Sequence, residues 1–406
     1  MPCRATRLLV LLLMSSGARR AAAAPEPSAA ACAAGEPPVT REFMREQLPL
    51  FANVFARRPD AGGSNAGGTG FFHGLYLWCL VRRLEPLHII ESGAFEGLGT
   101  WVLRQAAPSA QIIVVTPAMP GAYRDAHRDS LYFAGAEHFM DFAAVDWDCL
   151  NIDKSRTLIF FDDHMSGYRR ALEAHARGFV HIAFDDNYRP GSGDNFSPKA
   201  ACAAGLPCRR AAQASNATCK ASGARFVDFR CVGGCDETHA WRLGAADVQA
   251  IGASFRRVAA TYFEFPPVWP GPWRGVSGHF TQRAFERSTG KPLFNEAEAK
   301  PLARSLSSRL PPAAFRGRDA ESRAYSYFVY LRLNAATSPS TLHWPASIQL
   351  GSYSSPQALP PSSGAQCKRG APRPSWLSSL TSPLQHLLGW RPRLSTQSGS
   401  TLAHQG

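Results

Sequence analysis

Several familiar signatures are missing from this chain of 406 residues. It has neither a GxGxxG dinucleotide fingerprint nor a GK[ST] phosphate loop, which excludes the commonest nucleotide-binding turns. Its cysteines do not repeat a CxxC pair with suitably spaced histidines, so we expect no structural zinc site. We find no internal repeat, and no apolar run reaches the roughly 20 residues of a membrane-spanning helix.

Acidic residues are absent from the stretch after Asn334, although the whole chain carries a formal net charge of +13. The basic residues of this stretch are Lys368, Arg369, Arg373, Arg391 and Arg393. They are not interleaved with aromatic residues as in a nucleic-acid groove, so we expect no nucleic-acid partner. Ser and Pro dominate this region and periodicity is lost, which predicts a disordered basic tail at 336–406.

The N-terminus has the order of a signal peptide. Arg4 and Arg7 precede the apolar run 8–14, and the Ala-rich run 21–24 follows. This order predicts that residues 1–24 direct the chain into the secretory pathway, as a lumenal or secreted protein, with a linker at 25–40. An Arg-rich start without an acid before Glu26 also suits an organelle transit peptide, which remains the alternative.

Half of the ten cysteines lie close together. They are Cys202, Cys208, Cys219, Cys231 and Cys235. A glycosylation acceptor pattern, Asn216-Ala217-Thr218, lies among them. In an oxidising lumen the cysteines of such a cluster form disulfides, which cross-link a segment that buries few apolar side chains. We therefore expect an insertion at about 197–238 with two disulfides, and a fifth cysteine that stays free or pairs elsewhere.

The middle of the chain alternates short apolar runs with helical patterns. Expected strands are 88–91, 111–115, 157–161 and 181–184, and expected helices are 73–84, 100–107, 167–177 and 246–263. The strands are continuously apolar, which is typical of a parallel sheet covered on both faces. The composition, 45% hydrophobic, supports a sizeable core. We therefore predict an α/β, Rossmann-like, doubly wound and mostly parallel sheet in a domain at 41–335.

Three groups of residues follow expected strands, where a doubly wound sheet binds ligands. The first is a turn with Glu91, Gly93 and Gly97, which lets a cofactor approach the backbone. A β-branched residue at position 93 is therefore expected to block a cofactor while leaving the fold intact. An ordinary strand–helix turn also favours glycine, which is the alternative.

The second and third groups are pairs of carboxylates. Asp162 and Asp163, with His164 after them, end one strand, and Asp185 and Asp186 end another. Converging carboxylates repel one another unless protons or a cation neutralise them, and hard oxygen ligands suit Mg²⁺, Mn²⁺ or Ca²⁺. Such residues also cap helices and make turns. His164 is a candidate general base, and it could equally be a metal ligand.

Residues 89–100 resemble motif I of class I S-adenosylmethionine-dependent methyltransferases, in the E-x-G-x-x-x-G form of the cephalosporin hydroxylase and macrocin O-methyltransferase branch. The resemblance implies that Glu91, Gly93 and Gly97 cradle S-adenosylmethionine. It also implies that Asp162, Asp185 and Asp186 hold Mg²⁺. The family ends its second strand with an acid for the ribose hydroxyls, whereas this chain has Thr116 there.

The expected function is methyl transfer to a hydroxyl of a small molecule or glycan, with His164 or Asp163 taking the proton. A non-enzymatic lumenal or secreted binding protein with a degenerate cofactor site is the main alternative, and Thr116 favours it. A metal-dependent hydroxylase is a third possibility, although no triad of two His and one carboxylate is evident.

Overall fold

The structure is a computed structural model that describes residues 32, 35–59, 69–187, 196–204, 245–268, 291–310, 328–335 and 342–343. The expected leader at 1–24, residues 205–238 of the expected insertion and most of the expected tail lie outside the described residues. Within the described part, no helix combines the length and the apolar character that crossing a membrane requires.

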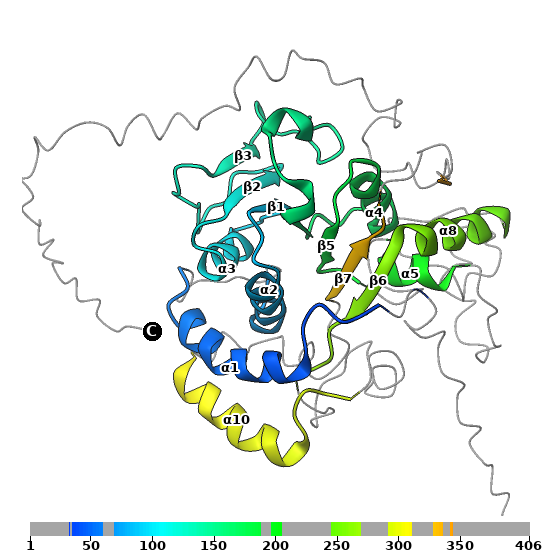
Figure 1. Cartoon of the computed structure of the whole chain (residues 1–406). Helices are drawn as coiled ribbons and strands as arrows, with labels where there is room; N and C mark the ends of the chain where they lie inside the picture. The colour runs from blue at the N-terminus through cyan, green and yellow to red at the C-terminus, as the bar shows by residue number, and fades with distance from the viewer. Residues whose placement is uncertain are drawn as a thin grey trace, which may run out of the picture.

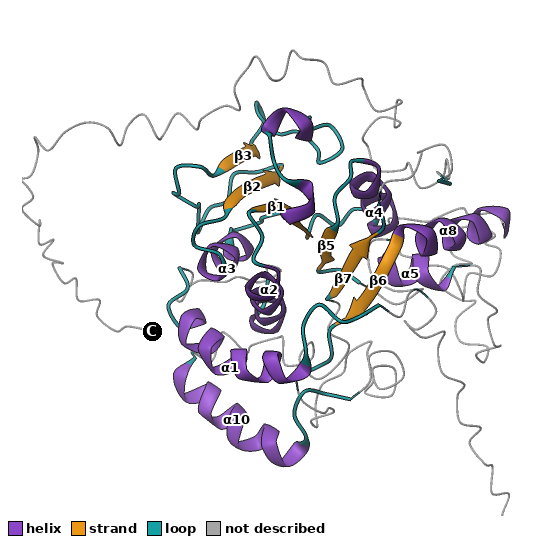
Figure 2. Ribbon diagram, in the orientation of Figure 1, coloured by secondary structure: helices purple, strands orange, loops and turns teal. Residues whose placement is uncertain are grey.

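A seven-stranded sheet forms the centre of the described part, in the order β3-β2-β1-β4-β5-β7-β6. Figure 2 shows this sheet with every strand except β4 labelled. The strands are β1 (His88–Ser92), β2 (Gln111–Thr116), β3 (Leu131–Ala134), β4 (Thr157–Phe161), β5 (His181–Phe184), β6 (Ala259–Glu264) and β7 (Val329–Leu333). Strands β1 to β5 pair in parallel, and β7 is antiparallel to both β5 and β6. The prediction of a Rossmann-like, mostly parallel α/β sheet is confirmed.

Alternate residues of the strands enter two separate cores. On β2, Ile112 and Val114 belong to one core, and Ile113 and Val115 to the other. All four side chains are buried. Burial on both faces explains why the central strands are continuously apolar, and each buried aliphatic side chain stabilises the fold by roughly 1.5–3 kcal/mol.

Helices cover both faces of the sheet (Figure 1). They are α1 (Arg41–Phe55), α2 (Phe71–Leu84), α3 (Leu98–Ala106), α4 (Gly167–Ala176), α5 (Pro198–Ala203), α8 (Ala245–Val258) and α10 (Glu296–Arg309). Two short 3₁₀ turns, Trp147–Leu150 and Lys154–Arg156, precede β4. Helices α2 and α3 pack on one face with α1 and α10 outside them, and α4, α5 and α8 pack together on the other.

One expected helix is partly a strand. The helix expected at 246–263 ends at Val258, and the chain continues directly into β6. Thr261, Tyr262 and Phe263 are β-branched or aromatic residues, which favour strands. They pair with β7, a partner about 70 residues further along the chain that a local pattern cannot reveal.

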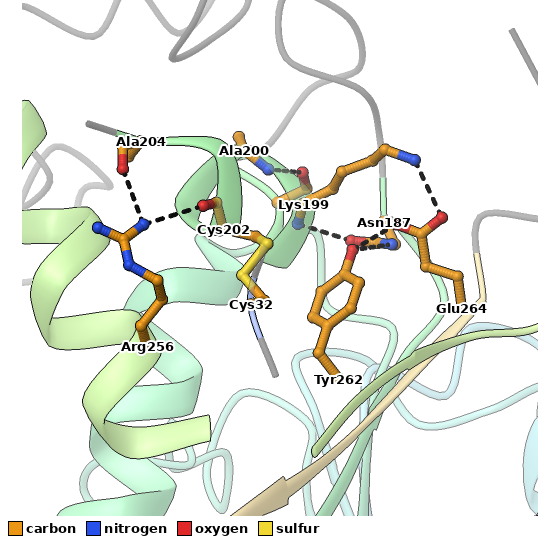
Figure 3. The surroundings of a disulfide bond; sticks show 10 residues. Cys32, Asn187, Lys199, Ala200, Cys202, Ala204, Arg256, Tyr262 and Glu264 are labelled. Atoms are coloured by element: carbon orange, nitrogen blue, oxygen red, sulfur yellow. Dashed lines mark hydrogen bonds and ion pairs between the residues drawn. A yellow bond between two sulfur atoms is a disulfide. The ribbon is translucent and has the colours of Figure 1, made fainter. Parts of the chain in front are cut away.

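The described part contains a disulfide between Cys32 and Cys202 (Figure 3). Both residues are buried. Cys202 lies in α5, whose end is held by Arg256 of α8 through the carbonyl groups of Cys202 and Ala204. Cys202 therefore finds its partner outside the cysteine cluster, before the sheet begins. Cys149 is also disulfide-bonded. The other four cysteines of the cluster lie outside the described residues.

Removing the Cys32–Cys202 bridge should lower the free energy of unfolding markedly. The bridge closes a loop of 170 residues. Closing so long a loop restricts the unfolded chain, so we expect a Cys32→Ala/Cys202→Ala variant to lose roughly 2–5 kcal/mol. Urea unfolding followed by circular dichroism measures this loss. The control is Cys79→Ala, which removes a buried free thiol without breaking a bridge. Equal stability of the double variant and the parent would contradict the prediction.

Candidate functional site

The candidate site lies where the strand order reverses. Strands β1 and β4 are neighbours, and the helices that follow them lie on opposite faces of the sheet. Hydrogen bonds continue the ladder beyond the strand ends: Asp162 N donates to Ser92 O (2.8 Å), Gly93 N to Val115 O (2.8 Å) and Asp185 N to Phe161 O (3.1 Å). The loops after β1, β2, β4 and β5 are thereby held side by side at the carboxyl edge, where sheets of this type bind ligands.

Three side chains gather at the ends of β4 and β5. Ligand atoms of Asp162, His164 and Asp186 all lie within 4.8 Å of one another. His164 Nδ1 is 3.0 Å from Asp186 Oδ2, and the His164 side chain is 55% exposed. The structure therefore brings together two of the three carboxylates expected to hold a metal and adds His164 to them.

The carboxyl group of Asp162 is in an environment that disfavours its charged form. Burial raises its pKa well above the usual range, and the charges of Asp185 and Asp186 raise it further. His164 acts in the opposite direction. A bound divalent cation would relieve this repulsion, since it adds the positive charge that the cluster lacks.

Asp185 has a partner that the sequence did not indicate. His73 Nδ1 lies 2.5 Å from Asp185 Oδ1, and both side chains are nearly buried. His73 lies in α2, in the apolar run FFHGLYLWCL, where a histidine reads as one more core residue. The pairing depends on α2 packing against the sheet near the end of β5, so a local pattern could not have found it.

Asp163 lies outside the cluster of Asp162, His164 and Asp186. It accepts hydrogen bonds from Ser92 Oγ (2.7 Å) and Arg170 Nε (2.9 Å). Arg170, which is almost fully buried in α4, also forms ion pairs with Asp141 and Glu173. Asp163 thus fixes the loop after β4 to β1 and α4. These contacts give Asp163 a structural role, and the catalytic role expected from its position in the sequence stays a prediction.

The glycines of the turn after β1 make room for the chain itself. Gly93 has φ +92° and Gly97 has φ +90°, in the left-handed region that favours glycine. A Cβ at Gly93 would collide with the backbone of Asp162, and one at Gly97 with the carbonyl oxygen of Tyr123. The expectation that a β-branched residue at 93 spares the fold is therefore wrong, because the backbone of Asp162, directly after β4, already occupies that space.

Glu91 is buried beneath the same turn. Thr100 Oγ1 donates a hydrogen bond to Glu91 Oε2, and a Cβ on Gly99 would overlap Glu91 Oε1. Burial raises the pKa of Glu91 to about 8, although the hydrogen bond from Thr100 opposes this shift. The Glu91 side chain is therefore protonated at neutral pH and stabilises the turn through its hydrogen bond with Thr100. It does not reach the solvent.

Glu91 should make stability fall as the pH rises. The pKa of an ordinary glutamate in an unfolded chain is about 4.3. Between that value and about 8 the folded state keeps a proton that the unfolded state has lost. Stability is then lost over this interval, by an amount on the order of a few kcal/mol. Glu91→Gln keeps the hydrogen-bond acceptor for Thr100 and should abolish this contribution. Urea unfolding at pH 5 and pH 8.5 tests the difference; an identical pH dependence in variant and parent would contradict it.

Thr116 ends β2, where the resemblance led us to look for a ribose-binding acid. Its side chain is buried, and its Oγ1 accepts a hydrogen bond from Ala94 N at 3.5 Å. It therefore ties β2 to the glycine turn. A single hydroxyl that is already engaged cannot bind two ribose hydroxyls as a carboxylate does.

The remaining features of the turn fit an anionic ligand group. Gly97 is the N-cap of α3 and has no side chain to bond the N–H groups of the first turn. Such a helix start is where proteins hold carboxylates and phosphates. The turn therefore suits the methionine carboxylate of a cofactor, and the two aspartates of the cluster suit Mg²⁺ or Mn²⁺.

The chain matches no family model and no curated protein. Solved structures with similar folds include a putative O-methyltransferase from Klebsiella pneumoniae (20% identity, 39% of this chain and 72% of the other, TM-score 0.22). A second is a methyltransferase from Podospora anserina bound to S-adenosylhomocysteine (16%, 38% and 64%, TM-score 0.22). A third is the O-methyltransferase TomG from Streptomyces achromogenes in complex with S-adenosylmethionine (15%, 36% and 65%, TM-score 0.22). At these identities and TM-scores the similarity assigns no family, activity or cofactor to this chain, whose described part is a mixed α/β, mostly parallel sheet.

Proposed function

We propose that the protein is an S-adenosylmethionine-dependent O-methyltransferase, assisted by a divalent cation and acting on a hydroxyl of a small molecule or glycan. One observation carries the proposal. The cluster of Asp162, His164 and Asp186 lies at the ends of β4 and β5, beside the glycine turn that follows β1. Methyl transfer to a hydroxyl needs a methyl donor, a polarised acceptor oxygen and a proton acceptor close together.

The glycine turn and the start of α3 would hold the cofactor. S-Adenosylmethionine, when bound, supplies the methyl group on a sulfonium sulfur. Gly97 leaves the first-turn N–H groups of α3 without a side-chain cap, so they can bind the amino-acid end of the cofactor. Glu91 supports this turn from beneath, and the hydrogen bond from Ala94 N to Thr116 fixes its distance from β2.

The cluster at β4 and β5 would act on the acceptor. Asp162 and Asp186 would hold the cation, which when bound supplies the positive charge that stabilises an alkoxide-like oxygen. His164 is the most exposed side chain of the cluster, so it is the member placed to receive the proton of the acceptor hydroxyl. Asp186 lies against Nδ1 of His164 and orients the imidazole that would receive this proton.

A transfer assay tests the proposal. The full chain is incubated with methyl-labelled S-adenosylmethionine and separate pools of phenols, sugars and hydroxy acids. We expect labelled product from one pool, loss of product with EDTA and recovery with Mg²⁺. No label in any pool, together with no binding of S-adenosylhomocysteine, would contradict the proposal.

A second candidate is a binding protein that does not transfer methyl groups. Thr116 favours it, because β2 ends without a carboxylate and the Thr116 hydroxyl is used within the protein. In that case S-adenosylhomocysteine should not bind, while Mg²⁺ still should. The hydroxylase alternative has less support, because the cluster offers one imidazole and two carboxylates where such iron sites use two imidazoles and one carboxylate.

We also propose that the protein acts in the secretory pathway, either in the lumen or outside the cell. The Cys32–Cys202 disulfide supports this location, since such bonds persist in oxidising compartments. Cys32 lies beyond the expected leader at 1–24, so the bond would survive removal of the leader. Peptide mapping of the secreted protein after thiol alkylation should find residues 1–24 removed and Cys32 and Cys202 linked. An intact N-terminus with both thiols free would favour the organelle alternative.

A further inference from the structure

We propose that Glu96 supplies the carboxylate that binds the ribose hydroxyls of the cofactor, in place of the acid that is absent from the end of β2. This inference rests on the proposed function, because it assigns a residue to the same nucleoside site. It names the part of the ligand that is recognised: the adjacent 2′- and 3′-hydroxyl groups of the ribose.

The chemistry of a ribose creates the need for such a residue. In Rossmann-type sheets an acid about 20 residues after the glycine motif accepts hydrogen bonds from the sugar hydroxyls. A carboxylate has two oxygens and can accept from both hydroxyls at once, whereas a threonine hydroxyl cannot. Thr116 is at the corresponding strand end, and its oxygen already accepts a hydrogen bond from Ala94 N.

Two other carboxylates near this edge are already engaged. Glu91 is 1% exposed and is hydrogen-bonded by Thr100. Asp125, in the segment between β2 and β3, is 3% exposed and is bound by the Arg104 guanidinium and by Ser130 Oγ. Charge-assisted bonds from Arg104 hold the pKa of Asp125 below its usual range against the effect of burial. Using either residue for a ligand would mean breaking buried hydrogen bonds.

Glu96 is differently placed. It lies within the glycine turn itself, is only half-buried, and forms no ion pair with the described part of the chain. Its carbonyl oxygen accepts hydrogen bonds from Ala122 N (3.2 Å) and Tyr123 N (3.0 Å), which fix the segment after β2 against the turn. The backbone of Glu96 therefore lies at the junction between the turn after β1 and the segment after β2.

Gly121 keeps space open for the carboxylate of Glu96. A Cβ added at Gly121 would lie 2.6 Å from Glu96 Oε2 and 3.8 Å from Oε1. The φ of Gly121 is not among the positive values, so alanine can adopt its backbone conformation. Alanine at position 121 would therefore displace the Glu96 carboxylate without straining the backbone. Gly121→Ala changes only the position of this carboxylate, whereas Glu96→Gln removes it.

Calorimetric titration tests the assignment. The probes are S-adenosylhomocysteine and its 2′,3′-dideoxy analogue, each titrated into the full chain. For Glu96→Gln we expect about 10- to 100-fold weaker binding of S-adenosylhomocysteine, because a charge-assisted hydrogen bond to the ribose is lost. The dideoxy analogue should bind the variant and the parent equally. For Gly121→Ala we expect a smaller loss, roughly 3- to 10-fold, again confined to the ligand with hydroxyls.

Asp129→Asn is the matched control, because it removes an exposed acid from the same segment between β2 and β3 and should leave both affinities unchanged. Equal affinities of Glu96→Gln and the parent for S-adenosylhomocysteine would overturn the role of Glu96 and leave the proposed function standing. An equal loss for both probes would also overturn it, since the effect would then not involve the hydroxyls. A parent protein that binds neither probe would overturn the proposed function and this inference together.

Discussion

Replacing Asp186 by asparagine is expected to lower the affinity for Mg²⁺ by about 100-fold or more, because the cation loses one of two charged ligands. The exchange conserves the shape of the side chain and keeps an oxygen within reach of His164 Nδ1, which lies 3.0 Å from Asp186 in the parent. Asp162→Asn should have a similar effect, since Asp162 belongs to the same cluster. Calorimetric titration with MgCl₂ at constant ionic strength measures both affinities.

Two further variants make this measurement specific. Asp129→Asn removes an exposed carboxylate that is not part of the cluster, so its Mg²⁺ affinity should equal that of the parent. His164→Gln should keep most of the affinity for Mg²⁺ but lose about 100-fold or more in the rate of transfer, because it removes the proton acceptor. If His164→Gln loses Mg²⁺ as fully as Asp186→Asn does, then His164 is a ligand and the proton has another acceptor. Unchanged Mg²⁺ binding in both aspartate variants would contradict the cation site.

Replacing Gly93 by valine is expected to destabilise the protein by about 4 kcal/mol or more, which exceeds the usual effect of a single substitution. Two causes add together. The φ of +92° is strained for a β-branched residue, and a Cβ there would collide with the backbone of Asp162, which cannot move without breaking the edge of β4. The hydrogen bond from Asp162 N to Ser92 O would be lost as well.

Gly135 provides the matched control for this second prediction. It has φ +79°, but a Cβ there would meet nothing within 4 Å. Gly135→Val therefore carries only the backbone strain, roughly 1–3 kcal/mol. Thermal and urea unfolding of the two variants should show Gly93→Val to be clearly the less stable. Equal destabilisation of both would mean that β4 does not approach the turn as closely as the structure shows.

The central strands were predictable because each is a short, continuously apolar run. The expected bounds 157–161 and 181–184 coincide with β4 and β5. Burial on both faces forces such runs to be apolar throughout, so the signal is local. Gly97 marks the start of α3 for a comparable reason, since only its left-handed backbone allows the turn.

Other elements were not predictable in this way. β7 contains Arg332, whose exposed side chain interrupts the apolar pattern. β6 follows α8 without a break, so its residues read as a continuation of the helix. These strands form because distant segments pair with them, and the local sequence does not identify the pairing partner.

In the candidate site, too, the local sequence predicted some contacts but not those that depend on how the helices pack. The sequence placed acids at the ends of β4 and β5, and strand adjacency is enough to bring Asp162 and Asp186 together. It could not say that Asp163 faces Arg170, because that contact depends on how α4 docks. Nor could it find His73, which reaches Asp185 from a helix that precedes the sheet in the chain.

The central claim is that the carboxyl edge of this sheet binds a methyl-donor cofactor beside a divalent cation. Calorimetric titration of the full chain with S-adenosylhomocysteine, before and after saturation with Mg²⁺, tests it most directly. We predict one binding event per chain in both conditions, and in Asp162→Asn retained binding of S-adenosylhomocysteine with loss of Mg²⁺ binding. No heat of binding for S-adenosylhomocysteine in the folded, disulfide-intact protein, with or without Mg²⁺, would contradict the claim.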